Sequence, residues 1–92
     1  MQFLKRLRDP IREGKITSSV RIWQSPRVKV GGRYPLAPGF IHVTSIRQIN
    51  LEDVTPAMAK ASGFEGTVDL LRTAKHGSGR NVYFIEFEYS KE

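Results

Sequence analysis

The sequence contains no cysteine, which excludes both a disulfide framework and a metal site built from thiolates. It has no apolar run long enough to span a membrane, and residues 1–6 lack the apolar core of a secretory signal. No glycine-rich fingerprint joins a predicted strand to a helix, which argues against a dinucleotide-binding or P-loop fold. We therefore expect one domain over residues 1–92, in the reducing environment of the cytoplasm, with no membrane partner.

Acidic residues are scarce in the first third of the chain. Residues 1–34 hold nine Lys and Arg against two Asp and Glu, a net charge of +7, whereas the rest of the chain holds six against seven, a net charge of −1. This asymmetry favours an anionic partner, of which nucleic acid is the commonest. Solubility alone would also explain a basic chain, and an acidic protein partner remains open. The sequence does not indicate an oligomeric state.

Turn residues and apolar periodicity predict five or six short strands interleaved with one short and two longer helices. Phe3 is the expected core anchor of the opening strand, Gly31-Gly32 is the expected turn of a hairpin, and Ala37-Pro38-Gly39 is a second turn. Asp9 and Thr55 are the expected N-caps of the first two helices, each followed by proline, with Gly14 and Gly63 as their ends. The predicted strands cover 2–7, 15–23, 27–30, 33–36, 40–49 and 81–89, and the predicted helices cover 9–14, 55–62 and 67–75, with Val68, Leu71 and Ala74 at helical spacing.

Polar and apolar residues alternate along the strand that begins at Lys15. In a β-strand, Lys15, Thr17, Ser19 and Arg21 share one face, with about 6.7 Å between successive side chains. The opposite face is mostly aliphatic and suits burial. Such a cationic and hydroxyl-bearing row can bind phosphates or a polar small molecule, although most polar sheet faces are simply solvated.

Gly14 and Arg21 have the separation of a family signature, Gly-x-Lys-x-x-x-x-Arg. With the order of the predicted elements, the chain resembles the ASCH domain family of PUA-like β-barrels over nearly its whole length. Further points of similarity are the Gly-Gly turn, the Thr-capped helix that ends at Gly63-Phe64, and the final Ile85-Glu86-Phe87 strand. The resemblance implies an α+β fold, a small open β-barrel with two or three short helices.

The signature lysine is replaced here. Position 16 is Ile16, and Lys15 stands one residue earlier, which in a strand is the opposite face. Small family members that hydrolyse N4-acetylcytidine are understood to use that lysine, a threonine (here Ser19) and a glutamate near the end of the next helix, where residues 55–62 carry no acid. A hydroxyl without base and acid is inert at neutral pH, so this amidohydrolase alternative is disfavoured.

Other members of the family are linked to RNA binding and to nuclease activity, which needs mainly positioning and charge at a phosphate. We therefore expect a domain that binds single-stranded RNA or DNA through a basic cleft. If it cleaves phosphodiesters, Lys15, Ser19 and Arg21 are the residues expected to act in catalysis. Trp23 and Tyr34 are expected to stack on bases. The full set expected to bind nucleic acid is Arg12, Lys15, Thr17, Arg21, Trp23, Arg33, Tyr34 and His76.

The two histidines do not indicate a metal site. His42 lies within a predicted strand and is interpreted as structural, while His76 lies in a glycine-rich loop, where a solvated role is commoner than catalysis. Neither has a companion carboxylate at the spacing of a metal site. We expect no built-in cofactor, although a nuclease is able to recruit a divalent cation through its phosphate substrate.

Overall fold

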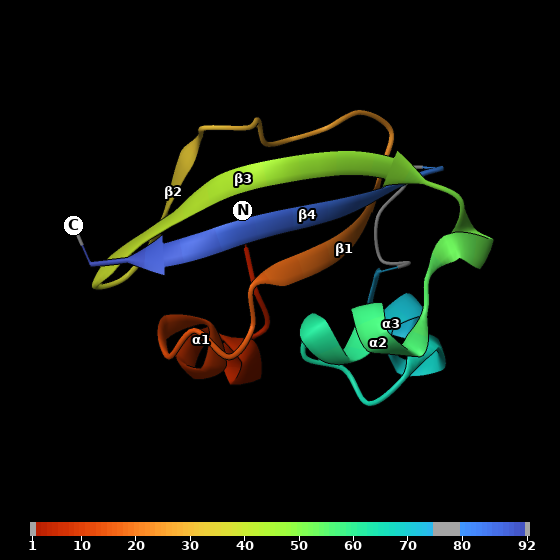
Figure 1. The fold of residues 1–92 in the computed structure, drawn as a ribbon, viewed down its shortest axis with the longest axis horizontal. Helices are drawn as coiled ribbons and strands as arrows, with labels where there is room; N and C mark the ends of the chain where they lie inside the picture. The colour runs from red at the N-terminus through yellow and green to blue at the C-terminus, as the bar shows by residue number, and fades with distance from the viewer. Residues whose placement is uncertain (1, 75–79, 92) are drawn as a thin grey trace.

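The computed structural model describes residues 2–74 and 80–91. In that part of the chain, four strands form one antiparallel sheet in the order β1-β4-β3-β2, curled like half a barrel, and the helices lie along its β1 side (Figure 1). The α+β class is confirmed, with four strands where five or six were expected. The elements are α1 (Lys5–Arg12), β1 (Ser18–Trp23), β2 (Arg33–Leu36), β3 (Gly39–Ile49), η1 (Leu51–Asp53), α2 (Pro56–Ala61), α3 (Thr67–Ala74) and β4 (Asn81–Ser90).

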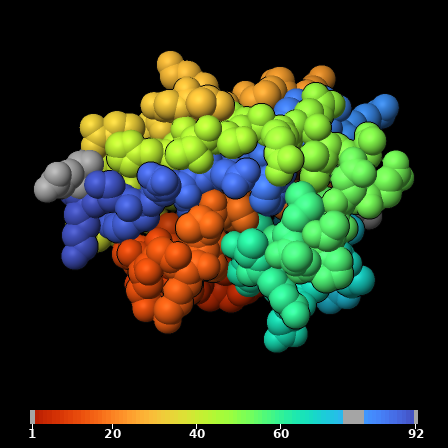
Figure 2. Space-filling model, viewed as in Figure 1, coloured from red at the N-terminus to blue at the C-terminus, as the bar shows by residue number. Residues whose placement is uncertain are grey.

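Strand β4 is an inner strand of the sheet, and both of its faces are covered over residues 82–85. Tyr83, Ile85 and Phe87 belong to one apolar cluster, which includes Phe3 and Leu7 from the α1 region. The alternate residues of β4, Val82 and Phe84, belong to a second cluster with Val20, Ile22, Val54, Ala59 and Leu70. The shared face predicted for Tyr83, Ile85, Phe87 and Tyr89 is confirmed. Two covered faces explain the nearly continuous apolar run of this strand. Figure 2 shows the two helical regions side by side beneath the sheet.

The N-terminal region differs from expectation. Residues 2–7 do not form a strand. Helix α1 begins at Lys5, and Asp9 and Pro10 lie inside it instead of starting it. The i, i+4 spacing of Phe3, Leu7 and Ile11 explains the difference, because all three are buried and the two in the helix lie on one helical face. Gly14 follows the helix with φ of +77°, so its predicted role as the helix end is confirmed.

The predicted Gly31-Gly32 hairpin is wrong. Residues 27–30 form no strand, and the glycine pair instead extends the pairing of β2 with β3. The Gly31 N–H donates to the Val43 carbonyl oxygen at 2.8 Å, and the Val43 N–H donates to the Gly32 carbonyl oxygen at 3.0 Å. The hairpin between β2 and β3 turns at Ala37-Pro38, where a turn was also predicted.

The later helices match the prediction closely. Thr55 Oγ1 accepts a hydrogen bond of 3.1 Å from the Met58 N–H at the start of α2, and Gly63 follows this helix with φ of +92°. Helix α3 buries Leu70 and leaves Val68 exposed, so its core-facing side is shifted from the predicted stripe. None of the helices in residues 2–74 and 80–91 is both long and apolar enough to cross a membrane.

Candidate functional site

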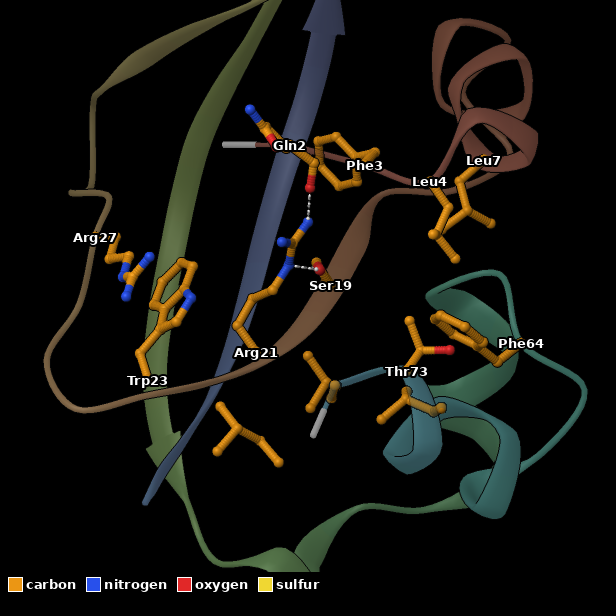
Figure 3. Close-up of a pocket in the computed structure, with 14 residues that line it drawn as sticks. Gln2, Phe3, Leu4, Leu7, Ser19, Arg21, Trp23, Arg27, Phe64 and Thr73 are labelled. Carbon is orange, nitrogen blue, oxygen red and sulfur yellow. Dashed lines mark hydrogen bonds between the residues drawn. The ribbon is translucent and has the colours of Figure 1, made fainter. Parts of the chain in front are cut away.

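A pocket of about 410 Å³ lies along the outer edge of β1, between the N-terminal segment and α3 (Figure 3). The volume is within the range of small-molecule sites. Strand β1 contributes residues from both of its faces, so the pocket wraps around the edge of the strand. Its lining comprises Gln2, Phe3, Leu4, Leu7, Ser19, Val20, Arg21, Ile22, Trp23, Arg27, Phe64, Leu70, Thr73 and Ala74.

Arg21 is the charged group at the centre of this site. Its Nε donates to Ser19 Oγ at 2.8 Å, and its Nη2 donates to the Gln2 carbonyl oxygen. The guanidinium carbon lies 5.0 Å from the centre of the Phe3 ring. Two of the five guanidinium N–H groups thus have partners, and the other three have none among the described residues.

The Arg21 charge has no counterion in the part of the chain that the structure describes. No carboxylate in residues 2–74 or 80–91 forms an ion pair with it. Desolvation by burial lowers the pKa of Arg21 below its usual value. Guanidinium remains charged at neutral pH even so. A cation withdrawn from water without an anion costs free energy, which an anionic ligand would recover.

Other cations surround the pocket. Arg27 is part of its lining. Arg6 Nη1 donates to the Gly63 carbonyl oxygen at 3.0 Å, and its guanidinium lies 5.1 Å from the Phe64 ring centre. Arg8 Nε donates to the carbonyl oxygen of Phe3 at 3.3 Å. None of the described residues that line the pocket is Asp or Glu. The pocket therefore has a positive potential, which favours anions.

Aromatic rings give the pocket apolar walls. Phe3 packs against Phe87 with 5.5 Å between ring centres, and Trp23 packs against Tyr83 with 6.1 Å between them. Trp23 is only 9% exposed, so most of its ring belongs to the core and only part of it borders the pocket. Phe64, half-buried, stands opposite on the α2–α3 connection (Figure 3). A planar group beside Arg21 would thus meet apolar and aromatic surface.

The structure brings together only part of the predicted polar row. Ser19 and Arg21 line the pocket with Trp23, whereas Lys15 and Thr17 do not. Strand β1 begins at Ser18, after both of these residues. Both are exposed, and Lys15 Nζ lies 3.3 Å from a carboxylate oxygen of Glu13. The predicted row from Lys15 to Arg21 is therefore divided, because only its second half lines the pocket.

Three of the remaining predicted binding residues, Arg12, Arg33 and Tyr34, lie outside the pocket lining. Arg12 donates from Nε to the Ala37 carbonyl oxygen at 2.6 Å and from Nη1 to Asp9 at 2.7 Å. The Tyr34 hydroxyl accepts a hydrogen bond of 3.0 Å from the Lys29 N–H, and the ring is half-buried against the core.

Arg33 and His42 also lie outside the pocket lining. The Arg33 guanidinium lies 4.5 Å from the Phe40 ring centre. His42 lies in β3, where its Nε2 is buried without a hydrogen-bond partner among the described residues. His76 lies outside the described residues.

The described residues of the pocket supply binding groups and no general base. Among the described residues that line it there is no His, Lys, Asp or Glu. The Ser19 oxygen accepts from a guanidinium, which cannot remove the hydroxyl proton. In residues 2–74 and 80–91 no group of three His, Asp or Glu side chains is placed to hold a metal ion. The arrangement suits recognition of an anion beside a planar group.

Several pocket residues were not predicted from the sequence. Gln2, Phe3, Phe64 and Thr73 come from segments far apart in the chain, and only the fold brings them to β1. Gln2 takes part through its carbonyl oxygen, which leaves no trace in the residue type. Arg27 was counted in the basic excess of residues 1–34, but its spacing from Arg21 in the sequence did not indicate that both line one pocket.

Comparisons with protein-family models, curated proteins and solved structures found no match to this chain.

Proposed function

We propose that this protein binds single-stranded nucleic acid, with one nucleotide in the β1 pocket and a phosphate of that strand on Arg21. The observation that carries the proposal is the half-buried guanidinium of Arg21, which has three N–H groups without a partner and no carboxylate partner among the described residues. A phosphate matches guanidinium geometry and restores the missing counterion. The apolar and aromatic walls suit an unpaired base.

The basic residues around the pocket support a polymeric ligand over an isolated nucleotide. Arg6 and Arg8 contact pocket residues from α1, and Arg27 lies in the lining. These side chains are exposed, so they can meet phosphates on either side of the bound nucleotide. Arg21 lies in a recess, which a single strand can enter by turning out a base, whereas a stacked duplex cannot without disrupting its pairs.

We also propose that the chain is a member of the ASCH family, and the fold is compatible with this. A half-barrel of antiparallel strands with α1 leading through Gly14 to β1 is compatible with a small PUA-like domain of the ASCH type. A cytoplasmic location fits a nucleic-acid ligand. We propose binding without cleavage, because the lining residues that the structure describes supply no proton acceptor. The alternative function, hydrolysis of N4-acylated cytidine, would need a proton acceptor as well, and the described lining residues supply none.

The experiment is a fluorescence anisotropy titration of the protein with labelled RNA and DNA decamers, single-stranded and duplex, in 50 to 300 mM salt. We expect preference for single strands and a slope of log K against log salt of about −2, equivalent to about three phosphate contacts. Arg21→Gln should weaken binding at least tenfold. Arg72→Gln removes the same charge from an exposed position of α3 outside this pocket and is the matched control. Equal affinities for the two variants would overturn the proposal.

Cleavage is tested in the same samples by gel analysis after prolonged incubation with and without Mg²⁺. We expect intact oligonucleotide with wild-type protein. Cleavage that is lost in Lys15→Ala and Arg21→Ala would instead establish a nuclease and would contradict binding without catalysis.

A further inference from the structure

Strand β1 is an edge strand, and its register fixes which main-chain groups face the pocket. It pairs only with β4, with Ser19 opposite Ile85 and Arg21 opposite Tyr83. The Phe87 N–H donates to the Thr17 carbonyl oxygen at 3.0 Å, so residue 17 belongs to a hydrogen-bonded pair. Because such pairs alternate along an antiparallel ladder, Ser19 and Arg21 also bond to β4. The N–H and C=O groups of Val20 and Ile22 therefore point away from β4.

The pocket lies where these groups point. In Figure 3, Phe64 and Thr73 lie on the side of β1 away from β4, and both line the pocket. Val20 and Ile22 are both lining residues, and their side chains are buried in the second apolar cluster. No hydrogen bond joins their main-chain N–H or C=O to another described residue. These two donor–acceptor pairs thus have no partner among the described residues, and the two residues that carry them border the pocket with 5% and 9% of their surface exposed.

A nucleobase has the matching pattern. Each base carries a donor next to an acceptor on its Watson–Crick edge, and unpaired bases are commonly recognised there. One residue of an edge strand presents its N–H and C=O on the same side, as it does toward a partner residue in an antiparallel pair. A base in the plane of the sheet would therefore receive one hydrogen bond and donate another to the same residue.

The length of the open edge argues against a peptide. Only Val20 and Ile22 present their outward main chain in the pocket, and they span about 7 Å at the usual rise of a strand. Toward the start of β1, Ser18 Oγ is hydrogen-bonded to Ser62 Oγ at 3.0 Å, and Ser18 does not line the pocket. Strands of typical length have five or six residues. The opening fits one base and not an added strand.

We infer that the main chain of β1 at Val20 and Ile22 reads the hydrogen-bonding edge of one base, while Arg21 between them holds a phosphate of the same strand. This inference rests on the proposed function and adds the group that contacts the base. It assigns the recognition to main-chain atoms. Among substitutions of these two residues, only proline removes such an atom, the N–H hydrogen.

Amide hydrogen exchange tests the inference without any variant. In the free protein the Val20 and Ile22 amides should exchange fast, and the Ser19 and Arg21 amides, bonded to β4, should exchange slowly. Saturating hexauridylate or hexaadenylate should slow exchange at Val20 or Ile22 at least tenfold and leave Ser19 and Arg21 little changed. Unchanged exchange at both Val20 and Ile22, in a complex that forms, would overturn the inference while the proposed function stands. Absence of any complex would overturn both.

Modified oligonucleotides provide the second measurement. N3-methyluridine or N6,N6-dimethyladenosine is placed at one position of the hexamer at a time, with an abasic position in parallel and 5-methyluridine as the control that leaves the edge free. At one position, edge methylation should weaken binding about tenfold, as the abasic site does. Equal affinities for all edge-methylated hexamers would overturn the inference.

Proline variants locate the contact. Val20→Pro and Ile22→Pro each remove one outward N–H without removing a bond to β4, and Val20→Ala and Ile22→Ala keep the N–H and serve as controls. One proline variant should bind the edge-methylated and the unmodified hexamer with equal affinity, whereas the alanine variants should still bind the methylated hexamer more weakly.

An uncharged five-residue peptide of alternating threonine and valine is added as a competitor. Displacement of the RNA by this peptide would identify strand addition and overturn the inference.

Discussion

Ser19 and Arg21 lie two residues apart on one face of β1, and the Ser19 hydroxyl oxygen accepts a 2.8 Å hydrogen bond from Arg21 Nε. This bond and the one to the Gln2 carbonyl oxygen fix the orientation of the guanidinium. The three unused N–H groups are therefore presented in a defined direction, in a pocket whose described lining has no acid. Such preorganisation lowers the entropic cost of holding an anion.

Arg21→Met separates stability from binding. Methionine keeps an apolar stem against Phe3 and removes a poorly solvated charge, so the free energy of unfolding should stay within about 1 kcal/mol of the wild type or increase. Binding of single-stranded RNA should fall at least tenfold. Urea denaturation and anisotropy measure the two effects. A loss of several kcal/mol in stability would show that Arg21 is mainly structural.

Binding should not depend on pH between about 5.5 and 8.5, because the described lining residues that carry charge are arginines. Burial lowers the pKa of Arg21, so the unfolded state binds this proton more tightly than the native state. Stability from this group therefore rises with pH only in the strongly alkaline range, near the lowered pKa. Anisotropy titrations across the neutral range measure whether the binding affinity depends on pH. A bell-shaped profile would reveal a titrating group in recognition.

Helix α3 should tolerate change on one side only. Leu70 is 1% exposed and Val68 is 69% exposed. Leu70→Ala should lower the free energy of unfolding by about 2–5 kcal/mol, since it removes apolar contacts and leaves a cavity. Val68→Ala, the matched control, should change it by no more than about 0.5 kcal/mol. Similar losses for both variants in urea denaturation would contradict the helix orientation described here.

The two glycines that end α1 and α2 should differ in their response to alanine. A Cβ at Gly63 would lie 2.6 Å from Leu7 Cδ2 and 2.6 Å from Ile16 Cδ1, whereas one at Gly14 would meet nothing within 4 Å. Both residues have positive φ, so each variant loses about 1 kcal/mol of stability from the backbone. Gly63→Ala should lose clearly more. Thermal denaturation compares the two, and equal losses would show that the side chains at Gly63 move aside freely.

Local signals predicted the helices of the second half and the last two strands, because their caps and apolar runs agree with the tertiary packing. Thr55, Gly63 and the β4 alternation are examples. The start of the N-terminal helix was misplaced because Pro10 indicated a first helical position, while the burial of Leu7 and Ile11 favours a helix that begins at Lys5.

The pocket was only half predictable. Alternation placed Ser19 and Arg21 on one face, but it could not show that β1 starts after Thr17 or that it is an edge strand. Gln2 reaches Arg21, and Phe64 reaches the pocket, through the three-dimensional fold alone. The outward main chain of Val20 follows from the register with β4, which no residue type records.

The contact between Arg21 and a phosphate is tested most directly by a scan with neutral methylphosphonate linkages, one position at a time in a single-stranded decamer. Wild-type protein and Arg21→Gln are titrated with the whole series. We predict one linkage at which neutralisation weakens wild-type binding about tenfold and leaves Arg21→Gln unaffected, which is a coupling of about 1.4 kcal/mol. The same loss in both proteins at every linkage would contradict the account.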